Sequence, residues 1–173
     1  MIMERGKPLL SPVDPTFIWF SLFLTLILNM LIGLGNYFWT PDLLAMSLVF
    51  WSVHQPRRVG IGAAFVFGLL MDVHESALLG QNALAYTLLC FGAISIHRRL
   101  LWFPVHQQSI QVLPLFALAA LTEWITRSFV GQALFNWGLL LAPLIQAVLW
   151  PVLSTLLLIP QRRDRSSVLN RTL

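Results

Sequence analysis

Six apolar runs, each closed by a short polar or cationic segment, account for most of this sequence. A helix that spans a membrane needs about 20 predominantly apolar residues. We therefore predict an all-α, polytopic membrane protein whose six transmembrane helices lie at about 17–34, 41–53, 57–73, 81–96, 105–129 and 136–159. The second range is shorter than a full span, so we expect either that residues 36–40 enter the membrane or that the bilayer thins locally.

Two short sequences indicate where the second and third helices begin. In Thr40-Pro41-Asp42 we expect Thr40 to be the N-cap, Pro41 to be the first helical residue, and Asp42 to supply a negative charge in the first turn. Pro56 follows the second run and is expected to open the third helix in the same way.

Small residues are frequent in the third predicted helix, which contains Gly60, Gly62 and Gly68. Small side chains allow neighbouring helix backbones to approach closely within a membrane. We therefore predict that the third helix is the central and most buried helix of the bundle, and that these glycines are packing positions.

Tryptophans lie near the ends of the predicted spans, where an interfacial aromatic belt is expected. The residues in this position are Trp19, Trp39, Trp51, Trp102, Trp124 and Trp137. Trp150 falls inside the sixth run and does not fit the pattern.

Cationic residues indicate the orientation of the spans, because ten of the eleven Lys and Arg residues fall on one side of a six-span arrangement. They are Arg5, Lys7, Arg57, Arg58, Arg98, Arg99, Arg162, Arg163, Arg165 and Arg171. Only Arg127 lies toward the other side. Cationic loops stay in the cytoplasm, so we predict that both termini are cytoplasmic and that Arg57, Arg58, Arg98 and Arg99 determine the topology. These dispersed pairs fit anionic lipid headgroups rather than nucleic acid.

Composition limits the classes of protein that the chain can form. Its residues are 57% hydrophobic and only 10% charged, whereas roughly a quarter are charged in a water-soluble domain. At 173 residues we expect a cytoplasmic arm at 1–16, a six-helix bundle at 17–160 and a basic cytoplasmic tail at 161–173, with no room for a separate catalytic domain. The single Cys90 excludes an intramolecular disulfide.

Four charged residues lie within or at the ends of the predicted spans: Asp42, Asp72, Glu123 and Arg127. Asp42 precedes Pro56 by fourteen residues and Asp72 follows it by sixteen, so both lie roughly 21–24 Å from the same turn. They either handle protons or cations as a pair, or they bond helix ends, with Asp42 capping its own helix and Asp72 accepting from the next loop. We favour the second interpretation, because helix ends are where charge is tolerated. Glu123 and Arg127 are spaced i,i+4 and are expected to form an ion pair.

Catalytic and cofactor motifs are not evident in the sequence. It contains no G-x-x-x-x-G-K-[ST], H-E-x-x-H or G-x-S-x-G pattern, and its four histidines have no metal-ligand spacing. Asn82 and Tyr86, four residues apart, form a polar stripe that we interpret as interhelical hydrogen bonding. We predict neither an enzyme nor a bound cofactor or metal.

A series of short motifs occurs in a characteristic order. They are Pro41-Asp42, Trp51, Pro56-Arg57-Arg58, the segment RVGIGAAFVFGLLMDV with Gly60, Gly62, Gly68 and Asp72, then Leu79-Gly80, Ala85-Tyr86 and Trp150-Pro151. Each motif alone is weak, but together, in this order and at this chain length, they resemble MreD, the rod shape-determining membrane protein family of bacteria. About 60 residues resemble the family in detail, and the remainder is similar in size, hydropathy and topology.

The resemblance implies a non-catalytic component of the elongasome, or Rod complex, in the bacterial cytoplasmic (inner) membrane. It implies direct binding to MreC, and through MreC a connection of MreB filaments to the RodA synthase and its transpeptidase. The implied fold is similar to the S component of energy-coupling-factor transporters. We place the candidate partner surface around Trp39, Asp42 and Asp72. The alternative is the membrane substrate-binding subunit of a small-molecule, vitamin-type transporter, which should have a polar, ligand-sized cavity near Asp42 and Asp72.

Overall fold

The structure is a computed structural model, and it describes residues 14–33, 40–75, 78–129 and 138–159 of the chain. These residues form six α-helices and no strand: α1 (Pro15–Gly33), α2 (Leu43–His54), α3 (Ile61–His74), α4 (Gln81–Leu100), α5 (Val105–Phe129) and α6 (Gly138–Leu158). Among the described residues, three segments are both long and apolar enough to cross a membrane: Pro15–Gly33, Val105–Phe129 and Leu140–Leu158. The helices α2 and α3 are apolar but shorter, at 12 and 14 residues.

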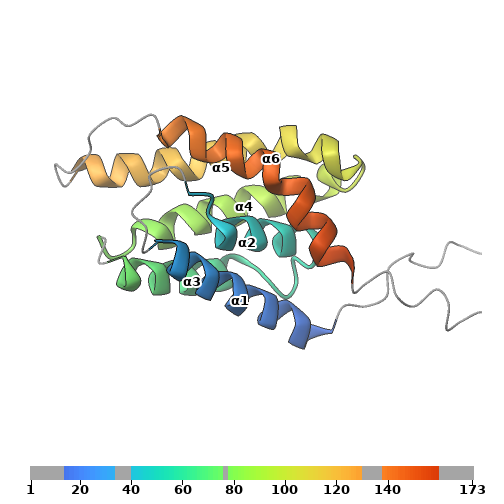
Figure 1. The fold of residues 1–173 in the computed structure, drawn as a ribbon, viewed down its shortest axis with the longest axis horizontal. Helices are drawn as coiled ribbons and strands as arrows, with labels where there is room; N and C mark the ends of the chain where they lie inside the picture. Colours follow the sequence, from blue (N-terminus) through green and yellow to red (C-terminus); the bar gives the residue numbers. More distant parts are fainter. Residues whose placement is uncertain (1–13, 34–39, 76–77, 130–137, 160–173) are drawn as a thin grey trace, which may run out of the picture.

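The helices lie roughly side by side, and α1 begins at the end of the bundle where α6 ends (Figure 1). Large apolar side chains such as Phe20, Phe91 and Val148 are exposed on the outside of the bundle. In water such a surface would be unfavourable, whereas lipid solvates it. The exposed apolar surface and the three long apolar helices together indicate a membrane protein.

The short helix α2 forms the centre of the bundle, where it packs against α1, α4 and α6 (Figure 1). All ten residues from Leu44 to Val53 are buried. By contrast, α3 exposes Phe65, Val66 and Val73. The prediction that α3 is the most buried helix was therefore wrong, because α2 is short and enclosed by its neighbours while α3 keeps one face on the outside.

The glycines of α3 have two different environments. A Cβ added at Gly68 would lie 2.4 Å from Cα of Ala83, so this glycine allows α3 and α4 to pack backbone against backbone. A Cβ at Gly62 would meet nothing within 4 Å, and one at Gly60 would meet only the carbonyl oxygen of Pro56 at 3.8 Å. Gly68 is thus the packing position that the sequence predicted, whereas Gly60 and Gly62 line a groove of about 500 Å³ beside Trp19.

Most helix bounds agree with the prediction to within two residues, and the exceptions have local causes. Pro56 does not open α3, since Arg58 and Val59 donate their backbone N–H groups to the carbonyl of Gln55, at 2.9 and 3.1 Å, and form a turn first. The third helix consequently begins at Ile61, with Gly60 as its N-cap. The fourth helix continues beyond 96 to Leu100, and α1 begins at Pro15, inside the predicted arm. The remainder of that arm and the predicted tail at 161–173 lie outside the described residues.

Two tryptophans are core residues. Trp51 is fully buried, and its indole N–H donates to Oγ of Ser21 at 2.8 Å, so its predicted place in an interfacial belt was wrong. Trp150 is also fully buried and donates to Oε1 of Gln108 at 3.3 Å, which explains why it does not fit the belt pattern. Trp19 and Trp102 are exposed, as a belt requires. Trp39 and Trp137 lie outside the described residues.

Candidate functional site

Asp42 joins three helices at one end of the bundle. Its Oδ1 accepts from the backbone N–H of Ala45 at 2.8 Å and from Nδ2 of Asn29 at 3.0 Å, and its Oδ2 accepts from the hydroxyl of Tyr86 at 2.5 Å. Oδ1 of Asn29 in turn accepts from the N–H of Leu43 at 3.3 Å. Asp42 is therefore the N-cap of α2, which confirms the interpretation that it caps its own helix and shows that the assignment of Thr40 as N-cap was wrong. Asp42 also holds α1 and α4 against α2.

Asp72, at the C-terminal end of α3, bonds the start of the next helix. Its two carboxylate oxygens accept from the backbone N–H groups of Gly80, Asn82 and Ala83 at 2.9, 2.7 and 3.3 Å. These donors lie in the first turn of α4, where Gly80 has a positive φ of 100°. Asp72 is only 1% exposed and is fully engaged within the chain. The interpretation that Asp72 bonds the following loop is confirmed, and its side chain is not presented to a partner.

The polar stripe predicted on α4 is confirmed as interhelical bonding. Tyr86 bonds Asp42 of α2, and Nδ2 of Asn82 donates to Oε2 of Glu75 at 3.2 Å. The similar depth predicted for Asp42 and Asp72 also agrees with this arrangement, since they bond to α4 residues that lie about one turn apart.

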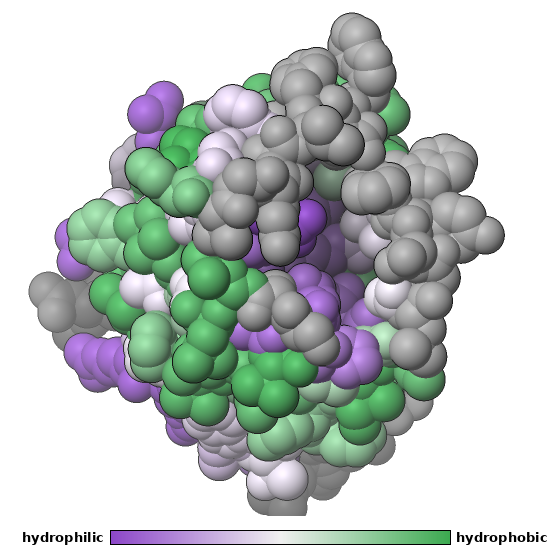
Figure 2. Space-filling view, turned by 90° about the vertical axis from the view of Figure 1, so that its left-hand side faces the viewer, coloured by the Kyte–Doolittle hydropathy of each residue, from purple (hydrophilic) through white to green (hydrophobic). Residues whose placement is uncertain are grey.

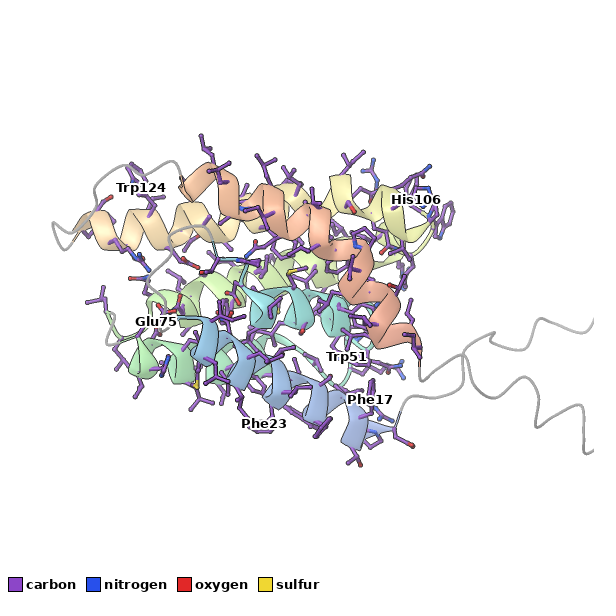
Figure 3. All side chains as sticks on the ribbon, in the orientation of Figure 1. Phe17, Phe23, Trp51, Glu75, His106 and Trp124 are labelled. Carbon is purple, nitrogen blue, oxygen red and sulfur yellow. The ribbon has the colours of Figure 1, made fainter. Side chains whose placement is uncertain are left out.

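A cavity of about 620 Å³ lies at this end of the bundle, and we call it the polar cavity. Its charged and amide-bearing lining residues are Asn29, Asp42, Glu75, Asn82, Glu123, Arg127 and Gln146. The view from this end shows hydrophilic residues gathered in a hollow, with apolar residues to its left and below it (Figure 2). Glu75 and Trp124 lie at this end, and Phe17 and His106 lie at the opposite end (Figure 3).

Two polar side chains in the cavity have no hydrogen-bond partner among the described residues. Gln146 of α6 is 7% exposed and lines the cavity, yet its amide makes no hydrogen bond within the described part of the chain. Glu123 of α5 is partly buried, and its carboxylate is likewise without a hydrogen bond there. Neither group is among the fully buried side-chain atoms that lack a partner in the described residues, so the polar atoms of both reach the open space of the cavity, where a ligand can bond them.

Arg127 does not form the ion pair predicted with Glu123. With the amide of Gln81 oriented to bring its oxygen toward Arg127, that oxygen accepts from Nε and Nη2 of Arg127 at 2.9 and 3.0 Å. In the part of the chain that the structure describes, no direct ion pair joins Arg127 to Glu123. The i,i+4 spacing places the two residues on one face, but Gln81 at the start of α4 provides a closer acceptor.

Only some residues of this site were predicted from the sequence. Asp42, Glu123 and Arg127 were predicted because they are charged, whereas the neutral residues Asn29 and Gln146 were not predicted. An amide inside an apolar run is the signal that could have found them, because uncharged polar groups also need partners within a membrane. Trp39, predicted to belong to the same surface, lies outside the described residues. Within the described ranges, no three His, Cys, Asp or Glu side chains are arranged to hold a metal ion.

The arginines predicted to determine the topology lie at the other end of the bundle. Arg57 and Arg58 follow the last turn of α2, and Arg98 and Arg99 are in the last turn of α4. The polar cavity and these cationic turns therefore lie at opposite ends of the described helices.

Comparison with known proteins gives a match over most of the chain. A family model described as rod shape-determining protein MreD matches residues 13–159. A curated relative, the rod shape-determining protein MreD of Haemophilus influenzae, is 26% identical over 115 residues, which are 64% of this chain and 68% of the relative. No solved structure matches the chain significantly, so the likeness to S components of energy-coupling-factor transporters stays a prediction.

Proposed function

The chain belongs to the MreD family of rod shape-determining proteins, and from this premise we propose that it organises cell-wall synthesis by binding MreC. It is a membrane protein of a structural, shape-determining family. In the proposed role it acts by association within the elongasome and catalyses no step itself. MreC would be its direct partner, with MreB filaments and the RodA synthase and transpeptidase connected through MreC.

The observation that supports this proposal is the pair of unpartnered polar groups in the polar cavity. Glu123 and Gln146 come from adjacent helices, α5 and α6, and neither has a hydrogen-bond partner in the described residues. A partner segment that enters the cavity would supply the missing partners. Binding would then favour a segment with matching polar groups, because a segment without them would remove Glu123 and Gln146 from water and leave both unpaired.

The membrane arrangement of the proposal follows from the cationic turns. All six helices cross the cytoplasmic membrane, with Arg57, Arg58, Arg98 and Arg99 on the cytoplasmic side beside anionic lipids and both termini inside. The polar cavity then faces outward. The outer, juxtamembrane segment of a bitopic protein such as MreC would be at the correct height to enter it.

A second candidate function rests on the size of the polar cavity. At about 620 Å³ it lies within the range of small-molecule sites, so a small-molecule-binding transporter subunit is the alternative. The two functions differ in what fills the cavity, which is a protein segment in the first and a free solute in the second.

Co-purification from native membranes separates these functions. The full-length chain is tagged, co-expressed with MreC of the same organism, and compared with the variants Ala120→Trp and Leu118→Trp. Ala120 lines the cavity, whereas Leu118 lies on the same helix and is 45% exposed on the apolar outside. We expect MreC to be retained by the wild type and Leu118→Trp but lost from Ala120→Trp. Equal retention by both variants, or a cavity-bound solute in a preparation without MreC, would contradict the proposal.

A further inference from the structure

We infer that the polar cavity recognises a cationic side chain, a guanidinium or an ammonium group, on the partner segment that enters it. This inference rests on the proposed function and specifies the chemistry of the same site. It follows from the charge balance of the cavity, from the acceptors left unused there, and from the engagement of the cavity's own cation.

The formal charge of the cavity lining is negative. Three carboxylates line the cavity, those of Asp42, Glu75 and Glu123, together with one guanidinium, that of Arg127, and the imidazole of His74. The chain as a whole has a formal charge of +4. The formal charge of the cavity lining is thus opposite in sign to the net charge of the chain. Carboxylates gathered at a site partly removed from water favour a cationic ligand.

Two acceptors of the cavity make no hydrogen bond among the described residues, the carboxylate of Glu123 and the amide oxygen of Gln146. Asp42 already accepts from Asn29, Ala45 and Tyr86. The carboxylate of Glu123, which only accepts when ionised, and the amide of Gln146 remain. A guanidinium has five N–H donors and an ammonium has three, so either group could bond the Glu123 carboxylate and the Gln146 oxygen together.

The guanidinium already in the cavity, that of Arg127, does not bond these unused acceptors. Arg127 donates to Gln81 and forms no direct bond with Glu123 within the described residues. An anionic ligand would meet three carboxylates, this one engaged guanidinium and the imidazole of His74, which bonds the carbonyl oxygen of Met30. A second cation is what the cavity lacks.

The cavity is also shaped for a cation attached to a longer group. Ala119, Ala120, Ala142 and Pro143 contribute small apolar walls beside the polar groups. The aliphatic stem of an Arg or Lys side chain packs on such a surface while its charged head bonds the acceptors. A volume of about 620 Å³ accommodates such a side chain together with neighbouring residues of its segment, and is far larger than a bare ion needs.

The test compares variants that remove either a negative charge, at Glu123, or a positive charge, at Arg127, from the cavity. Binding of MreC to the full-length chain in lipid nanodiscs is measured for the wild type, Glu123→Gln, Glu123→Asp and Arg127→Gln, each checked for folding by thermal unfolding. Loss of one charge-assisted hydrogen bond should weaken binding about tenfold in Glu123→Gln. Glu123→Asp should retain part of the affinity, and Arg127→Gln, whose new amide can still bond Gln81, should bind MreC at least as tightly as the wild type.

The other outcomes distinguish failure of the proposed function from failure of the inference that the ligand is cationic. If the wild type binds no MreC, the proposed function itself fails. If the wild type binds MreC but Glu123→Gln binds equally well, or if Arg127→Gln weakens binding while Glu123→Gln strengthens it, the cationic ligand is wrong and the proposed function stands. Agmatine, a small guanidinium compound, tests whether the cation belongs to a free solute and not to a side chain of the partner segment. We expect no stabilisation of the isolated chain at micromolar agmatine, and stabilisation there would assign the cavity to a free solute.

Discussion

The hydroxyl of Tyr86 donates a 2.5 Å hydrogen bond to Oδ2 of Asp42, and this bond fastens α4 to the first turn of α2. Both residues line the polar cavity. The same contact therefore holds the central helix in position and forms part of the cavity wall, so the stability of the bundle and the shape of the site are connected here.

Replacing Tyr86 with Phe should destabilise the bundle. The variant keeps the ring but removes the donor, which leaves one oxygen of a partly buried carboxylate without its protein partner at a cost of about 1–2 kcal/mol. Thermal unfolding of the purified protein in detergent measures this change. An unaltered midpoint would show that Asp42 does not depend on the Tyr86 hydroxyl.

Because Gly68 and Gly62 of α3 have different surroundings, a methyl group added at each should change the stability of the bundle differently. Gly68→Ala should lower stability by about 1–3 kcal/mol, because its Cβ would overlap the backbone at Ala83. Gly62→Ala is the matched control and should be neutral or slightly stabilising, since its Cβ meets open space and alanine favours helix. Equal stability of the two variants, compared under the same detergent conditions, would show that α3 and α4 do not approach closely at Gly68.

Gln146→Leu should separate stability from binding. Leucine has a similar size and removes an amide that bonds nothing in the described residues, so the stability of the isolated chain should change by no more than about 1 kcal/mol. Binding of MreC should fall about tenfold, because the amide is then missing from the complex. A loss of stability in this variant would mean that the amide is satisfied within the isolated chain.

The orientation of the spans predicts a labelling pattern in intact cells. Single cysteines at Leu79, between α3 and α4, and at Leu101, after α4, are both at exposed positions, while the natural Cys90 is buried and contributes little background. A membrane-impermeant maleimide should label the cysteine at Leu79 but reach the cysteine at Leu101 only after lysis. The reverse pattern would overturn the assignment of the cationic turns to the cytoplasm.

The sequence predicted the helical class, the bounds of α5 and the bonding role of Asp72, because these depend on local patterns of apolar residues and on helix-end chemistry. It did not predict which helix is central. Small residues permit either close packing or a groove, and only the neighbours decide, as Gly68 and Gly62 show. Similarly, Trp51 lies near a helix end but is buried, since α2 is shorter than the helices around it. The polar cavity brings α1 and α2 together with α5 and α6, and such long-range proximity has no signature in one sequence.

Site-specific photocrosslinking tests most directly the claim that a segment of MreC occupies the polar cavity. A photoreactive phenylalanine analogue is placed at Ala142, which lines the cavity on α6, or at Leu144, which lies on the same helix and is 48% exposed on the apolar outside. In growing cells the analogue at Ala142 should crosslink to MreC, and the analogue at Leu144 should not. Crosslinking to MreC from Leu144 alone, with none from Ala142, would contradict the account and place the partner on the outer face of the bundle.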